Sequence, residues 1–279
     1  MSLSASKEKE SIEIIHHALD LGINYFDTAD LYEKGLNEIM LGKALQSKRG
    51  SSIIATKVGN QWRPDGSGWD WNPGKEYILK CAEASLKRLQ TDCIDLYQLH
   101  GGTIDDPIDE VIEAFEQLKT QGKIRFYGIS SIRPNVIREY VKRSNIVSVM
   151  TQYSLADRRP EESTLNLLQQ NNIGVLVRGA LAQGLLVDKT AKEYLGHSET
   201  EIAGAAQQLQ GVAVTTHTAA QAAVQFVLQH PAITSAVVGV SRMQQLSEIA
   251  ATTEKAALTQ ENMELLRTAL PPKVYEQHR

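Results

Sequence analysis

Short runs of continuously apolar residues recur along the chain at intervals of roughly 30 residues, and a helical pattern follows each of them. A run that is apolar at successive positions is typical of a strand buried on both faces of a parallel sheet. The pattern therefore predicts seven strands, near Ile23–Asp27, Ile53–Lys57, Asp95–His100, Phe126–Ser131, Ser148–Tyr153, Gly174–Leu181 and Ser235–Ser241.

The segments between these strands carry helix signals. Lys7–Leu21 has apolar residues at helical spacing. Asp106 is placed to cap a helix whose first position is Pro107, and Gly122 is placed to end it. Further helices are predicted after Arg133-Pro134 and over Thr218–Gln229, before Pro231.

Alternation of strands and helices predicts an α/β fold with a parallel sheet and right-handed crossovers. An open doubly wound sheet and a closed barrel both fit this alternation. Seven visible strands, and the absence of a glycine-rich phosphate loop after any of them, favour a (β/α)8 TIM-type barrel. No linker interrupts the chain, so we expect one domain over residues 1–279. Because the first element is a helix, we expect this barrel to lack its N-terminal hairpin and first strand.

Composition narrows the function classes. The 279 residues carry a formal net charge of -4 and no basic tract, which argues against nucleic acid as a partner. No run is long and apolar enough to predict a membrane span, and Met1–Glu10 does not resemble a secretory signal. Two cysteines, Cys81 and Cys93, and histidines without metal-ligand spacing predict a cytoplasmic protein without a metal site. The sequence leaves the oligomeric state open.

Polar residues stand where the predicted strands end. The first three strands end in Asp27, Lys57 and His100. Parallel strands bring their carboxyl ends to one rim, where barrel enzymes carry out their chemistry. Asp27 and Lys57 on neighbouring strands would satisfy each other's charge. Taken singly each residue has an ordinary structural explanation, but together with Tyr32 they form a converging group.

This group has a chemical logic. A phenol is a poor proton donor near neutral pH, and a nearby ammonium favours its ionised form. Lys57 can supply that charge, and Asp27 can orient Lys57. His100 can donate a hydrogen bond to a substrate oxygen. Such a site polarises a carbonyl and protonates it as hydride arrives from a cofactor, because no side chain supplies hydride.

The same residues resemble the aldo-keto reductase family. Gly22-Ile23-Asn24-Tyr25-Phe26-Asp27-Thr28-Ala29-Asp30-Leu31-Tyr32 is similar to the family's strongest motif, and Lys57 and His100 follow in the family's order. The resemblance extends from about Glu8 to Thr252. It implies a (β/α)8 barrel that uses NADPH to reduce aldehydes or ketones. It also implies that Tyr32 is the general acid, that Lys57 and Asp27 tune it, and that His100 orients the carbonyl.

The resemblance also implies a cofactor site for NADPH (NADP+ after reaction). Ser130 and Gln152 match residues that hold the nicotinamide carboxamide. Arg242 would pair with the 2′-phosphate, since guanidinium suits phosphate oxygens. The remaining matches are Gly179, Leu181, Gln183 and Gly184 along the pyrophosphate, and Gly239, Ser241, Gln245 and Glu248 at the adenosine phosphate.

Several positions depart from the family pattern. Ser131 stands where the family often has Asn, and Arg178 stands where an aromatic ring commonly stacks on the nicotinamide. A guanidinium can also stack on a ring. Ile249 replaces a frequent adenine-contacting Asn. The stretch Met1–Ser4 resembles the segment that follows the family's first strand.

The segment Asn60–Gly74 is predicted to be a loop over the rim, with Trp62 and Trp69 against the substrate. Equally, its indoles could simply pack the loop. The leading hypothesis is an NADPH-dependent oxidoreductase that converts a small-molecule carbonyl into an alcohol. One alternative is a regulatory or inactive barrel that binds NADPH without significant turnover. Another uses Lys57 as a Schiff-base nucleophile, which the neighbouring Asp27 disfavours.

Overall fold

The computed structural model describes residues 7–213 and 217–279, and these residues group into two compact units. The first unit holds the described residues up to Val149 together with Gly239–Met243. The second holds Met150–Val238 and Gln244–Arg279. The expectation of one domain stays a prediction. Met1–Ser4 lie outside the described residues.

Four strands of the first unit lie side by side in the order β1-β2-β5-β6, and each neighbouring pair is parallel. Ala55 lies opposite Leu96, and Leu96 lies opposite Phe126. Five of the six residues of β2 and all six of β5 are buried, as expected for strands covered on both faces. The strand bounds are β1 Tyr25–Asp27, β2 Ile53–Val58, β5 Ile94–Leu99 and β6 Ile124–Ser130.

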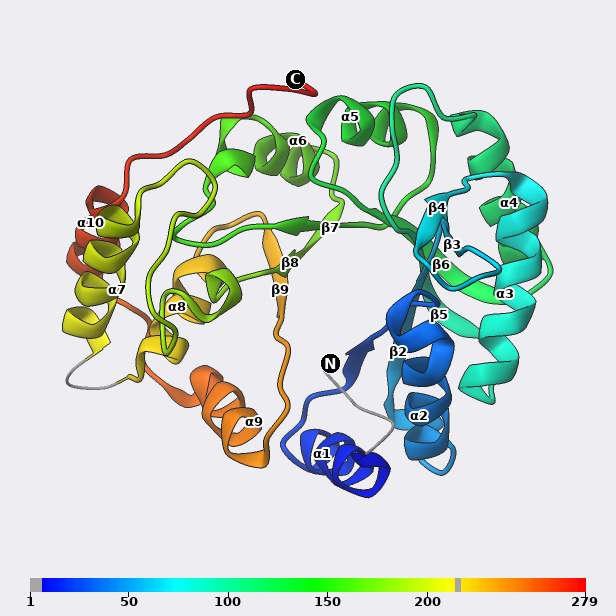
Figure 1. Cartoon of the computed structure of the whole chain (residues 1–279), viewed down its shortest axis with the longest axis horizontal. Coiled ribbons are helices and arrows are strands. Elements are labelled where there is room, and N and C mark those ends of the chain that lie inside the picture. The colour runs from blue at the N-terminus through cyan, green and yellow to red at the C-terminus, as the bar shows by residue number, and fades with distance from the viewer. Residues whose placement is uncertain (1–6, 214–216) are drawn as a thin grey trace. The chain divides into compact units, whose positions relative to one another are not determined.

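Consecutive helices of this unit pack against one another, α1 on α2, α2 on α3 and α3 on α4, along one side of these strands (Figure 1). In α4 the residues Val111, Ala114, Phe115 and Leu118 recur at helical spacing and are buried. The Phe115 ring stacks on Tyr127 at a centroid distance of 5.3 Å. The helix bounds are α1 Glu8–Asp20, α2 Leu36–Leu45, α3 Lys75–Leu89, α4 Ile108–Thr120 and α5 Pro134–Arg143.

A short antiparallel hairpin follows β2. Its strands, β3 (Asn60–Trp62) and β4 (Trp69–Trp71), pair with each other in a separate two-stranded sheet. Register places Trp62 opposite Trp69 and Asn60 opposite Trp71. The expectation of a loop over Asn60–Gly74 is therefore corrected, because cross-strand pairing of the tryptophan-bearing segments orders its central part.

The second unit continues the alternation of strands and helices. Here β8 and β9 pair in parallel, while β7 begins at the end of the first unit. Helix α8 begins with a capping box, in which Thr218 and Gln221 each accept a hydrogen bond from the other's backbone amide. The bounds are β7 Ser148–Gln152, β8 Gly174–Arg178, β9 Ile233–Val237, α6 Thr164–Gln170, α7 Glu199–Ala213, α8 Ala219–Leu228, α9 Met243–Ala250 and α10 Gln260–Ala269.

All seven predicted strands are present, and the two largest differences from the predicted bounds are at the ends of the last two strands. The predicted strand Ser235–Ser241 is β9, which begins at Ile233 and ends at Val237. The predicted strand Gly174–Leu181 ends at Arg178, because Gly179 adopts a left-handed conformation with φ of 76°. The residues directly after Arg178 and directly after Val237 thus lie in loops.

Asp106 does not cap α4. The helix begins after Pro107 without a side-chain cap. The Asp106 carboxylate instead accepts hydrogen bonds from the Thr103 amide at 2.7 Å and from the Trp71 indole at 2.9 Å. It therefore joins the hairpin to the loop that follows β5.

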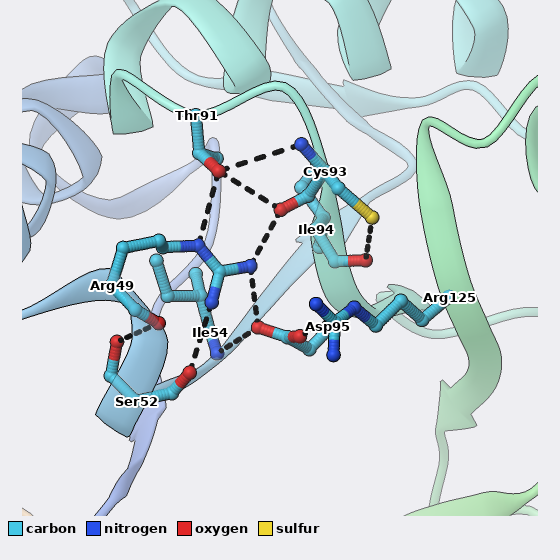
Figure 2. A network of polar contacts seen from close by, with 8 residues as sticks. All are labelled: Arg49, Ser52, Ile54, Thr91, Cys93, Ile94, Asp95 and Arg125. Atoms are coloured by element: carbon cyan, nitrogen blue, oxygen red, sulfur yellow. Dashed lines mark hydrogen bonds and ion pairs between the residues drawn. The ribbon is translucent and has the colours of Figure 1, made fainter.

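A buried carboxylate ties together the amino-terminal ends of three strands (Figure 2). Asp95, the second residue of β5, accepts the backbone amide of Ile54 in β2 at 2.9 Å. Its oxygens also pair with Arg49 at 2.7 Å and with Arg125 of β6 at 3.2 Å. Arg49 donates further to Thr91 and to the carbonyls of Ser52 and Cys93. The network supports the end of the sheet opposite to the predicted catalytic residues.

Candidate active site

The predicted catalytic residues all belong to the first unit. Asp27 is the last residue of β1, Lys57 is the fifth residue of β2, and His100 follows β5 directly. The backbone carries the parallel pairing past the strand ends, since the amide of His100 donates to the Val58 carbonyl at 2.7 Å. The three side chains therefore lie at the carboxyl ends of adjacent strands.

Lys57 and Asp27 form a buried ion pair. The Lys57 Nζ lies 2.5 Å from Asp27 Oδ2 and donates a second hydrogen bond to the Thr28 carbonyl at 2.8 Å. Only 1% of the Lys57 side chain and 9% of that of Asp27 are exposed. Gln98 of β5 donates to the other Asp27 oxygen at 3.4 Å. The ammonium is thus held in one position by an ion pair and a hydrogen bond, which argues against a free nucleophilic amine.

Tyr32 lies next to this pair. The Lys57 ammonium is 5.1 Å from the centroid of the Tyr32 ring. The ring also meets His100 edge to face, with centroids 5.8 Å apart and an interplanar angle of 84°. Phenol, ammonium, carboxylate and imidazole therefore gather in one place, as the sequence predicts.

The chain after Tyr32 is strained. Glu33 and Lys34 both adopt left-handed conformations, with φ of 48° and 55°, and Gly35 follows with φ of 87°. Left-handed backbone is unfavourable for residues with a side chain, and it recurs at functional sites where surrounding contacts hold it. Here the contacts include the Lys34 ammonium, which lies 5.0 Å from the centroid of the Trp62 ring.

The hairpin lies beside the catalytic loop. The Trp62 indole donates to the carbonyl of Leu31, the neighbour of Tyr32, at 3.2 Å. Trp71 lies against Gly101, just after His100: a Cβ added to Gly101 would meet the Trp71 ring at 3.4 Å. Trp69 is about half exposed. Trp62 is thus close to the site, and Trp71 is its counterpart beside His100.

Ser130 is the last residue of β6 in the same unit, Ser131 follows it, and both are buried. The Ser131 hydroxyl accepts the amide of Arg133 at 3.1 Å, so it closes the turn into α5. Gly239, Ser241 and Arg242 also belong to the first unit, in the loop after β9, and Arg242 is exposed.

Predicted cofactor residues in the second unit centre on Gln152. Its side-chain oxygen accepts from Arg178 at 2.7 Å, and its nitrogen donates to Asp157 at 2.9 Å and to the Tyr194 hydroxyl at 3.2 Å. The structure therefore joins Gln152 to Arg178. A Cβ on Gly179 would lie 3.2 Å from the Gln152 side chain, so glycine keeps this approach close.

The other predicted cofactor positions of this unit follow in two segments. Gln183 and Gly184 form a tight turn with φ of 61° and 91°, and Leu181 precedes it. Gln245 and Glu248 lie in α9, where the Glu248 carbonyl accepts a hydrogen bond from Gln221 at 2.8 Å. Nothing in these contacts tests their roles, so they stay predictions.

Sequence reasoning did not single out Asp30, which lies between β1 and Tyr32 and is 9% exposed. Burial, followed by repulsion from Glu38, raises the pKa of the Asp30 carboxyl to about 7. No local residue pattern signals this, because the charged groups that act on Asp30 include Glu38 of α2, Lys57 of β2 and Arg88 of α3.

Residues 7–213 and 217–279 offer little for other kinds of site. No helix among them is both long and apolar enough to cross a membrane. No group of three or more His, Cys, Asp or Glu side chains among them is placed to hold a metal ion. Cys81 and Cys93 are free thiols.

Known proteins resemble this chain over its whole length. The model of the aldo/keto reductase family matches residues 1–270. An uncharacterized oxidoreductase, YqkF, of Bacillus subtilis (strain 168) is 47% identical over all of this chain and 93% of its own length. The holo form of aldo-keto reductase AKR11C1 from Bacillus halodurans superimposes with a TM-score of 0.91 at 48% identity, covering 98% of this chain and 91% of that structure.

A more distant solved structure, an aldo/keto reductase from Klebsiella pneumoniae in complex with NADP and acetate, has a TM-score of 0.79 at 26% identity. The superposition covers all of this chain and 91% of the Klebsiella pneumoniae chain. The predicted (β/α)8 class of fold is confirmed by this likeness and by the likeness to AKR11C1. The chain therefore belongs to the aldo/keto reductase family and is an NAD(P)H-dependent oxidoreductase.

Proposed function

We propose that the protein reduces an aldehyde or ketone to the alcohol with NADPH, and that Tyr32 donates the proton. The observation that carries the proposal is the Tyr32 ring beside the buried Lys57 ammonium, at 5.1 Å. When a phenol gives its proton to a developing alkoxide, negative charge forms on the phenol oxygen. A fixed cation nearby stabilises that charge.

Each neighbour of Tyr32 has a part in this scheme. Asp27 holds Lys57 in place through its 2.5 Å contact. His100, whose ring meets Tyr32 edge to face, donates a hydrogen bond to the substrate oxygen and orients the carbonyl. Trp62 and Trp69 contact the substrate from the hairpin.

The donors and glycines of this chain fit a nicotinamide dinucleotide. The close approach of Gly179 to Gln152 leaves room that a Cβ would fill, and Arg178 presents a planar cation there. Ser130, Ser131 and Gln152 would bind the carboxamide, and the exposed Arg242 would bind a 2′-phosphate. The Gly179–Gly184 segment and the residues near Gly239 would follow the phosphates. The cofactor supplies the hydride when bound.

Two observations support NADP over other cofactors, and a third supports a cytoplasmic location. The Klebsiella pneumoniae relative was solved with NADP. In this chain Arg242 offers a guanidinium for the additional phosphate, and free Cys81 and Cys93 suit a reducing compartment. Arg242→Ala should weaken NADPH binding roughly tenfold or more, because a charged hydrogen bond contributes about 1.5 to 3 kcal/mol, and should leave NADH binding nearly unchanged.

The decisive variant is Tyr32→Phe. Loss of a general acid should lower turnover of an aldehyde panel by about 10² to 10⁴-fold. NADPH binding, followed by tryptophan fluorescence, should change little. Tyr140→Phe is the matched control, because the Tyr140 hydroxyl is buried with no hydrogen-bond partner among the described residues. Normal turnover by Tyr32→Phe would refute the assignment, and binding without turnover in the unaltered protein would favour a non-catalytic barrel.

A further inference from the structure

Asp30 is a buried carboxyl that the proposed reaction does not use. Its backbone amide donates to the Lys57 carbonyl at 3.3 Å, so it lies on the segment that connects Asp27 to Tyr32. No described residue donates a hydrogen bond to its Oδ1, which is buried from solvent. An ionised carboxylate in such a place lacks the partners that usually compensate for lost water.

The charged groups around Asp30 are already paired. On β2, Lys57 is bound to Asp27 at 2.5 Å. On α3, Arg88 is bound at 2.6 Å to Glu38 of α2, which is fully buried. Two cations thus face three carboxyl groups, and Asp30 is the one without a cation of its own.

The other titratable groups that face Asp30 are neutral. They are Tyr77 and Cys81 on α3 and Tyr97 on β5. Burial is the largest cause that raises the pKa of each, and it brings that of Cys81 to about 11. None of them can supply a positive charge, and an ionised Asp30 would give this group of side chains one excess negative charge.

Some groups raise the pKa of the Asp30 carboxyl and others lower it, and the raising influences are larger. Burial raises the pKa of its carboxyl most, and the negative charge of Glu38 adds to this. Arg88, the backbone amide of Leu31 and Lys57 lower that pKa, but less, so that the carboxyl reaches about 7. The carboxyl is therefore largely neutral in mildly acidic solution and ionises as the solution becomes alkaline.

We propose that Asp30 is a positioning residue that keeps its proton while the site is active, so that the Lys57 ammonium serves only Asp27 and Tyr32. This proposal rests on the proposed function of Tyr32 as proton donor. When Asp30 ionises, a second carboxylate competes for Lys57. It also opposes the negative charge that forms on the Tyr32 oxygen, and carbonyl reduction slows.

The first test asks whether Asp30 holds a proton, and it needs no turnover. Because the folded state binds the proton more tightly than the unfolded state, stability is fully present at low pH and is lost as the pH rises through about 7. The urea midpoint of the unaltered protein should therefore decrease as the pH rises from about 5 to about 7, and it should level off above that. Asp30→Asn should remove most of this fall, and Asp92→Asn, at an exposed carboxyl, should not.

The second test asks whether that proton matters to the reaction. For a group with a pKa of about 7, the neutral fraction falls roughly thirtyfold between pH 6 and pH 8.5. Carbonyl reduction by the unaltered protein should fall by a similar factor relative to Asp30→Asn, because Asn reproduces the neutral carboxyl. Asp92→Asn should follow the unaltered protein.

The outcomes separate the two proposals. If the urea midpoints of the unaltered protein and Asp30→Asn depend on pH in the same way, Asp30 is ionised and the inference is wrong, whatever the activity. If the midpoints differ but the rate profiles coincide, Asp30 is a structural residue only, which also overturns it. Should Asp30→Asn not fold, the infrared carbonyl band of a protonated carboxyl in the unaltered protein decides: it should disappear above neutral pH, and its absence at pH 6 would refute the inference.

Discussion

The contacts of the Asp95 carboxylate at the amino-terminal ends of the strands (Figure 2) allow an estimate of how much this network contributes to the free energy of unfolding. Asp95→Asn removes its charge but keeps an oxygen that can accept the Ile54 amide. Breaking a buried ion pair costs about 3 to 5 kcal/mol. Arg49 is a quarter exposed and Arg125 mostly exposed, so solvent screens both pairs. We therefore expect Asp95→Asn to lower the free energy of unfolding by about 2 kcal/mol.

Asp95→Ala removes the hydrogen-bond acceptor as well. It leaves the Ile54 amide, which donates to Asp95 at 2.9 Å, without its partner. An unsatisfied buried donor costs about 1 to 3 kcal/mol more, for a total near 4 kcal/mol. For a chain of this length each kcal/mol lowers the thermal midpoint by about 2 to 4 °C.

Urea unfolding followed by circular dichroism measures these differences. Asp92→Asn, at an exposed carboxyl nearby, is the control and should change stability by less than about 0.5 kcal/mol. Turnover per folded molecule should be unchanged in all three variants, because Lys57 and His100 lie at the opposite ends of their strands. If Asp95→Asn and Asp95→Ala both lie within the range of the control, the network does not stabilise the fold.

Two further changes test packing and strain. Gly42→Ala should lower the free energy of unfolding in urea by about 1 to 3 kcal/mol, because the added Cβ would lie 2.6 Å from the Leu89 backbone. The control Gly204→Ala has open space around the new Cβ and should raise that free energy by up to about 1 kcal/mol. Equal effects of the two variants would contradict the close approach of α2 to α3. Glu33→Gly should raise the urea midpoint by the equivalent of about 0.5 to 1 kcal/mol, since glycine accepts φ of 48° without strain, and a lower midpoint would show that the Glu33 side chain outweighs that strain.

The main parts of the fold and site were open to prediction because their causes are local. Continuous apolar runs predict buried parallel strands, and a polar residue directly after such a run predicts a side chain at the rim. Asp27, Lys57 and His100 follow from this rule, and the contact of Lys57 with Asp27 follows from their adjacent strands.

Other features depend on contacts between distant segments. The strands of the hairpin have three residues each, too few for alternation to distinguish them from a loop. Asp106 has the sequence context of a helix cap, but the Trp71 indole and Thr103 bind it instead. The burial of Asp30 results from the packing of α2 and α3, which no local pattern records.

The hairpin of residues 60–71 has a consequence for how substrate preference could change. Its two strands satisfy each other's backbone and take no part in the larger sheet. Its ties to the rest of the first unit include the Trp62 and Trp71 indoles, which bind the Leu31 carbonyl and Asp106. The turn between the two strands, residues 63–68, can therefore be lengthened, shortened or exchanged without breaking the hydrogen bonds of any strand in the larger sheet. Because we propose that Trp62 and Trp69 of this hairpin contact the substrate, sequence libraries confined to the turn should change the substrate range with little loss of folded protein.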